Sequence, residues 1–189
     1  MQVLKPEIYN DILLNAYDLI ANDGLSFKMA DLAKKCNVTP GNLYRYFENK
    51  AAIINEITRP AIEDINTIVQ KVTLNKLSFN NTDFNDFYLN IDMLAKDLTY
   101  IYFKHGLSLE ILAQDLSVRK SVLKWLDSVL TNGYNLKGVE QSSVLAEMTS
   151  QAILRGVLIA FSEQKNMDLT SKQLETVLAT FLNQMLTDF

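Results

Sequence analysis

Apolar residues recur at three- and four-residue spacing through most of the chain, which is the pattern of amphipathic helices. Runs that alternate apolar and polar residues, as half-buried strands do, are few, and the chain has only three prolines and six glycines. The pattern therefore predicts an all-α protein with about nine helices. We expect them at residues 6–22, 26–36, 40 onward, 50–72, 83–104, 109–114, 118–132, 141–164 and 170–189.

Residues 26–50 have the pattern of a helix-turn-helix, two short helices joined by a tight turn. The small side chain of Ala33 lets the two helices cross closely, and Asn37 tolerates the left-handed backbone that closes the turn. Thr39 is the expected N-cap of the second helix, with Pro40 in its first turn, and Ser26 is the expected N-cap of the first. The spacing thus predicts a compact N-terminal DNA-recognition element.

The second helix of this pair presents side chains that can bond to base edges and phosphates. The run from Ile12 to Ile53, above all VTPGNLYRYF followed by Lys50, resembles the DNA-binding domain of TetR-type (tetracycline-repressor-like) regulators. The resemblance covers about a third of the chain. It implies phosphate contacts by Tyr44 and Lys50, although a solvated side chain is the alternative for Lys50. Lys28 stands where that family usually has threonine, and a lysine there can reach a phosphate. The expected DNA contacts are Lys28, Thr39, Pro40, Gly41, Asn42, Tyr44, Arg45, Tyr46 and Lys50.

Charge is distributed unevenly between the two expected domains. Residues 1–50, the expected DNA-binding domain, hold six Lys/Arg and six Asp/Glu, so the net charge of −4 belongs to residues 51–189. A neutral N-terminal domain joined to an acidic remainder argues against indiscriminate nucleic-acid binding, because such binding depends on the neutralisation of phosphates by basic residues. A short, well-placed set of phosphate contacts in each protomer of a dimer is compatible with this balance.

The helix expected to begin at Lys50 contains Pro60, which removes one backbone hydrogen bond and predicts a kink. This helix connects the DNA-binding domain to the helical remainder of the chain. The kink is either a hinge for signal transmission or a bend that fits the core.

Residues 51–189 are expected to form a helical ligand-binding and dimerisation domain. Residues 141–164 and 170–189 have apolar faces too wide for one small protomer to cover, and Thr170 with Gln173 forms an expected capping box. A four-helix bundle with a second copy would cover these faces, and the resemblance implies the same homodimer. An apolar effector is expected between the body helices, with core packing as the alternative for each candidate residue. The candidates are Tyr88, Met93, Tyr100, Trp125, Gln151 and Arg155.

Motifs of catalysis are missing from the sequence: it has no Gly-rich phosphate loop, no HExxH, no CxxC and no GxSxG. We therefore expect neither an enzyme nor a metal site or cofactor. One cysteine suits a reducing cytoplasm, and no apolar run reaches the ~20 residues of a membrane span. The leading interpretation is a ligand-responsive repressor that binds a palindromic operator as a homodimer. The alternative is an architectural or nucleoid-associated protein of the same fold that acts through a protein partner.

Overall fold

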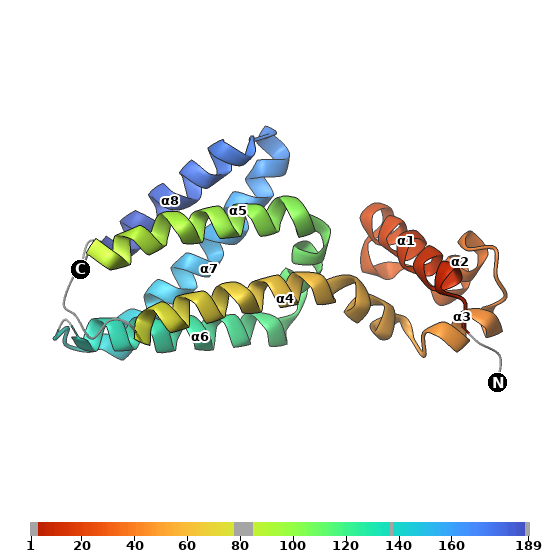
Figure 1. Cartoon of the computed structure of the whole chain (residues 1–189), viewed down its shortest axis with the longest axis horizontal. Coiled ribbons are helices and arrows are strands. Elements are labelled where there is room, and N and C mark those ends of the chain that lie inside the picture. The colour runs from red at the N-terminus through yellow and green to blue at the C-terminus, as the bar shows by residue number, and fades with distance from the viewer. Residues whose placement is uncertain (1–3, 78–84, 137, 188–189) are drawn as a thin grey trace. The chain divides into compact units, whose positions relative to one another are not determined.

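The computed structural model describes residues 4–77, 85–136 and 138–187. In that part of the chain it contains eight α-helices, a short 3-10 helix at Gly24–Ser26 and no strand, which confirms the all-α prediction (Figure 1). The helices are α1 (Pro6–Asp23), α2 (Met29–Lys35), α3 (Pro40–Tyr46), α4 (Lys50–Leu77), α5 (Asn85–Gln114), α6 (Leu116–Leu136), α7 (Ser142–Met167) and α8 (Ser171–Thr187).

The chain forms two compact units that meet within α4, between Ile62 and Glu63. Pro60 lies inside α4, just before this division. The functional boundary expected at residue 50 stays a prediction, as does the use of Pro60 as a hinge.

Local capping sets the ends of the short helices in the first unit. The Thr39 hydroxyl accepts a hydrogen bond from the Asn42 backbone N–H at 3.2 Å, as expected of the N-cap of α3. Asn37 has φ 53°, the left-handed backbone expected in the turn. The expected cap at Ser26 is wrong: α2 begins at Met29, and the Ser26 hydroxyl donates to the Asp23 carbonyl instead. Ser26 is therefore the last residue of a 3-10 helix and lies three residues before the start of α2.

The first unit is held together by an apolar core under the helix-turn-helix. Ile12, Leu32 and Leu43, from α1, α2 and α3, are each fully buried, so three separate segments share one core. The ring of Phe47 stacks on that of Tyr9 with centroids 5.0 Å apart. This core fixes the angle at which α3 is presented.

In the second unit α6 packs along α7 and α5 along α8, while α7 also contacts α8 (Figure 1). Leu174, Leu178 and Leu182 form the buried stripe of α8. The expected capping box is present, because the Thr170 N–H donates to Gln173 Oε1 at 2.9 Å and the Gln173 N–H donates back to the threonine hydroxyl. The helix expected at 109–114 is the last part of α5, which continues through a non-helical residue at His105.

One described helix, α7, is long and apolar enough to cross a membrane by length and composition alone. Buried helices of soluble proteins meet the same criterion, so it is weak evidence. One face of α7 is in the core through Ile153 and Val157, while Met148 and Ile159 are exposed. The apolar character of α7 thus comes from two faces, of which only one is buried within the protomer.

Candidate nucleic-acid interface

The exposed face of α3 contains most of the side chains expected to contact DNA. Thr39, Gly41 and Arg45 are exposed, as is the Pro40 ring, while Leu43 points into the core with no exposed surface. Tyr44 is 52% exposed, although aromatic side chains of this size are usually more buried. The short helix therefore has one buried anchor and a polar, aromatic outer face of the kind that fits a major groove.

Lys50 and Tyr46, both expected DNA contacts, make long-range hydrogen bonds within the protein. The Lys50 ammonium donates to the backbone carbonyls of Leu25, at 2.5 Å, and Phe27, at 3.3 Å, and lies 5.0 Å from the Phe27 ring centroid. The Tyr46 hydroxyl accepts a hydrogen bond from the backbone N–H of Lys5 at 3.1 Å. Lys50 thus joins the start of α4 to the loop before α2, and Tyr46 joins the end of α3 to the start of α1.

The N-terminal ends of α2 and α4 are organised by short polar contacts. Lys28 is the N-cap residue of α2 and is exposed; its backbone N–H donates to Asp31 Oδ2 at 3.3 Å. Asn49 Oδ1 accepts from the Ala52 N–H at 2.9 Å, so Asn49 caps the start of α4. The bond of Lys28 to Asp31 thus involves its backbone, and its ammonium has no ion pair within the described part of the chain.

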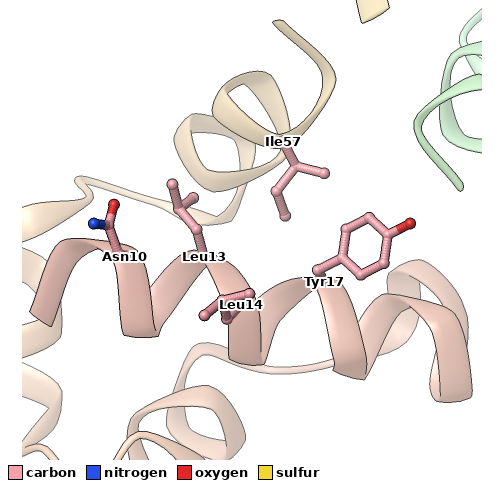
Figure 2. A pocket seen from close by; sticks show the side chains of 5 residues that line it. All are labelled: Asn10, Leu13, Leu14, Tyr17 and Ile57. Carbon is pink, nitrogen blue, oxygen red and sulfur yellow. The ribbon is translucent and has the colours of Figure 1, made fainter. Parts of the chain in front are cut away.

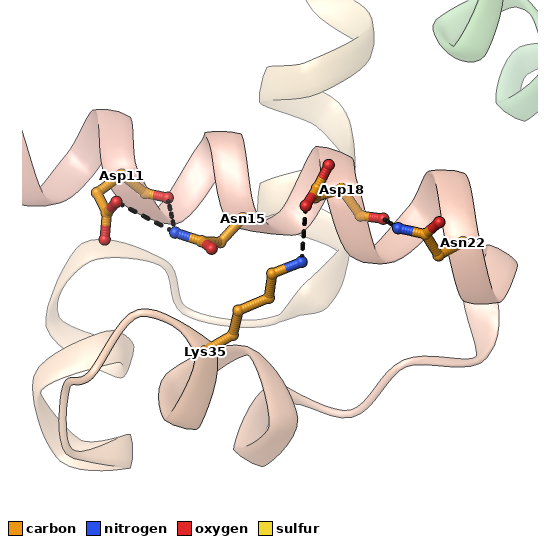
Figure 3. A network of polar contacts seen from close by, with 5 residues as sticks. All are labelled: Asp11, Asn15, Asp18, Asn22 and Lys35. Carbon is orange, nitrogen blue, oxygen red and sulfur yellow. Dashed lines mark hydrogen bonds and ion pairs between the residues drawn. The ribbon is translucent and has the colours of Figure 1, made fainter.

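A polar network that includes an ion pair between α2 and α1 links these two helices (Figure 3). The Lys35 ammonium lies 2.9 Å from Asp18 Oδ2, so this lysine is paired inside the unit. Asn15 donates to the backbone carbonyl and to the side chain of Asp11, one turn earlier in α1. Burial raises the pKa of the Cys36 thiol to about 11, so this cysteine is a neutral packing group at the end of α2.

A shallow pocket of about 440 Å³ lies between α1 and α4 in the first unit (Figure 2). It is lined by Asn10, Leu13, Leu14, Tyr17 and Ile57. None of the residues expected to bind an effector lines it.

The side chains expected to bind an effector are spread over three helices of the second unit. Met93 and Tyr100 are about half exposed on α5, and Gln151 and Arg155 are exposed on α7. Trp125, on α6, is half-buried. Tyr88 belongs to α5, but its side chain lies outside the described part of the chain.

Residues 12–57 match the family model described as bacterial regulatory proteins, tetR family. Among curated proteins, no sequence matches the chain. Several solved structures have its fold. FadR from Bacillus subtilis, in complex with stearoyl-CoA, has 17% identity and a TM-score of 0.64 over 96% of this chain and 99% of its own.

Two further structures extend the comparison. The fatty acid degradation regulator FadR from Bacillus halodurans has 20% identity and a TM-score of 0.60 over 100% of this chain and 98% of its own. NalD is the secondary repressor of the MexAB-OprM multidrug efflux pump in Pseudomonas aeruginosa. It has 16% identity and a TM-score of 0.60 over 97% of this chain and 99% of its own. At these identities the likeness shows the fold. The sequence match at residues 12–57 spans the helix-turn-helix and the start of α4, so this segment of the chain is similar to the tetR-family model.

Proposed function

We propose that the protein is a ligand-responsive repressor that binds a palindromic operator as a homodimer in the bacterial cytoplasm. The observation that supports this most is the exposed face of α3, held by the Thr39 cap at one end and by the buried Leu43 beneath it. A recognition helix of seven residues reads only a few base pairs, so a two-fold pair of such helices on a palindrome supplies the remaining specificity. We propose no catalytic role.

Base reading is assigned to Asn42 and Arg45, and phosphate contact to Tyr44 and Lys28. An arginine pairs with guanine and an asparagine with adenine in the major groove. Lys50 is also proposed to contact phosphate, and binding DNA would then require its ammonium to exchange a loop carbonyl for a phosphate oxygen. Thr39, Pro40, Gly41 and Tyr46 complete the proposed contact surface.

Dimerisation is proposed through residues 141–164 and 170–189. Three large apolar residues of α7 support this: Val144, Met148 and Ile159 are 53%, 67% and 54% exposed, and their spacing places them on one face. Val177 of α8 is also 45% exposed. A face that combines these exposed apolar residues with Gln151 and Arg155 fits a self-complementary two-fold interface.

The position of this face also decides which substitution tests the dimer. Val157 is buried in the protomer's own core, and the Phe181 ring packs at Gly156, so a charge at either would unfold the protomer. Met148→Glu is therefore the informative variant, with Ser143→Glu, exposed off this face, as its charge-matched control. Sedimentation at micromolar concentration should show a dimer for the wild type and the control and a monomer for Met148→Glu. A monomeric wild type would contradict the proposal.

For the effector we propose an apolar acyl chain joined to coenzyme A, since one solved structure of the same fold is a complex with stearoyl-CoA. Tyr88, Met93, Tyr100 and Trp125 remain the proposed apolar contacts. Gln151 and Arg155 lie on the same face of α7 as Met148, so contact with the second protomer is the alternative for them.

The sole tryptophan, Trp125, makes the effector test direct, because its emission reports on the body alone. Stearoyl-CoA should change this emission saturably, and coenzyme A without the acyl chain should not. In the same titration the acyl-CoA should release a duplex that the wild-type protein has enriched from random sequence. An effector must bind the DNA-incompetent state more tightly to do so. If no acyl-CoA changes operator binding, this effector class is rejected. If the second unit binds another protein instead, an architectural role is favoured.

A further inference from the structure

The cations of the first unit are unequally available to DNA. Lys35 is paired with Asp18, and Arg59 with Glu56 at 3.2 Å. The Lys50 ammonium is bonded to two loop carbonyls. Lys50, which the resemblance to TetR-type regulators implies as a phosphate contact, is therefore engaged inside the fold.

The C-terminal end of α3 needs a cation more than its other end does. The last carbonyls of a helix carry partial negative charge, which repels a phosphate placed beside them. The backbone N–H groups at the start of α3 have the opposite effect. A phosphate next to Tyr46 is thus bound only if a basic side chain is held nearby.

The Lys5 backbone is held at the tip of the Tyr46 side chain. Its backbone N–H donates to the hydroxyl of Tyr46, the last residue of α3, at 3.1 Å, although 41 positions separate the two residues. Its backbone carbonyl accepts from the Tyr9 N–H at 3.2 Å, so both sides of the Lys5 backbone are anchored. The residue is exposed, and its ammonium has no ion pair with any residue that the structure describes.

We propose that Lys5 is a phosphate-binding residue that supplies the positive charge beside the C-terminal end of the recognition helix. The inference rests on the proposed operator binding. The anchored backbone places a mobile ammonium beside α3 at a small entropic cost, because only the side chain has to be ordered on binding. Glu7, in the first turn of α1, is favoured by the positive end of its own helix and makes no described bond to Lys5.

The test uses Lys5→Gln in the full-length protein, with Lys5→Arg as the conservative variant and Lys120→Gln, exposed on α6, as the charge-matched control. Anisotropy titrations on the duplex enriched by the wild type are repeated across salt concentrations from about 50 to 200 mM. Lys5→Gln should make the slope of log affinity against log salt less negative, by about 0.9 for each protomer or about 1.8 for the dimer. Affinity should fall about 3- to 10-fold at the lower salt, with unchanged sequence preference.

Lys5→Arg should retain the wild-type slope. Circular dichroism should be the same for all variants, because the bonds of Lys5 involve its backbone. A Lys5→Gln slope equal to that of Lys120→Gln overturns the proposal. If the wild type enriches no sequence, operator binding is wrong, and the salt slope on an unselected duplex still decides whether Lys5 contacts phosphate.

Discussion

Gly156, inside α7, is the position where one added carbon should have the largest effect on the packing of the second unit. A Cβ there would lie 2.1, 2.5 and 2.7 Å from three atoms of the Phe181 ring on α8. An ordinary carbon–carbon contact needs about 3.5 Å, so the ring would have to retreat by about 1.4 Å. The close approach of α7 and α8 therefore depends on a residue without a side chain.

Two opposing terms determine the effect of Gly156→Ala. Alanine is favoured over glycine in a helix interior by about 1 kcal/mol. Overpacking a formed core costs about 1–3 kcal/mol. The free energy of unfolding should therefore stay level or fall by up to about 2 kcal/mol. Gly133 of α6 is the matched control, because a Cβ added there would meet no neighbouring atom within 4 Å, and Gly133→Ala should stabilise by up to about 1 kcal/mol.

Urea unfolding at one fixed protomer concentration measures both variants, since a dimer's stability depends on concentration. The two alanine variants should differ by about 1–3 kcal/mol. In a Phe181→Ala background the clash is gone, so Gly156→Ala should become stabilising. Equal stabilisation by Gly156→Ala and Gly133→Ala in the wild-type background would refute the packing argument.

Three further predictions concern polar contacts and α4. The hydrogen bond from Lys104, and after it the one from His105, hold the pKa of the Asp64 carboxyl below its usual range. The stability that the ionised carboxylate adds to the fold is therefore fully present above the unfolded pKa of about 4, and it is lost as the pH falls through the lower folded pKa. The difference in unfolding free energy between the wild type and Asp64→Asn should therefore shrink in acid, and a difference independent of pH would contradict it. Lys50→Met should lower the free energy of unfolding by about 1–2 kcal/mol through its two unpaired carbonyls, whereas unchanged stability with a flatter salt slope would indicate phosphate contact alone. Pro60→Ala should stabilise α4, and a changed operator affinity or effector response in the same variant would establish the hinge, which unaltered titrations would exclude.

Features that depend on near neighbours along the chain could be predicted from the residues alone. The Thr39 cap, the left-handed Asn37 and the box formed by Thr170 and Gln173 are each confirmed. Such features involve residues within one helical turn, so the side-chain chemistry and the spacing are both visible in the sequence. The cap at Ser26 was wrong because two overlapping local choices, a 3-10 turn and a helix start, compete there.

Contacts across long separations depend instead on how the helices pack. The bond from Lys5 to Tyr46 and the bonds from Lys50 to the loop before α2 join residues 41 and 23–25 positions apart, and no spacing rule indicates them. Packing also selects which apolar face of α7 is internal. A helix that is apolar on two sides has no periodic signal to distinguish them, so contact with α6 and α8 buries Val157 and leaves Met148 exposed.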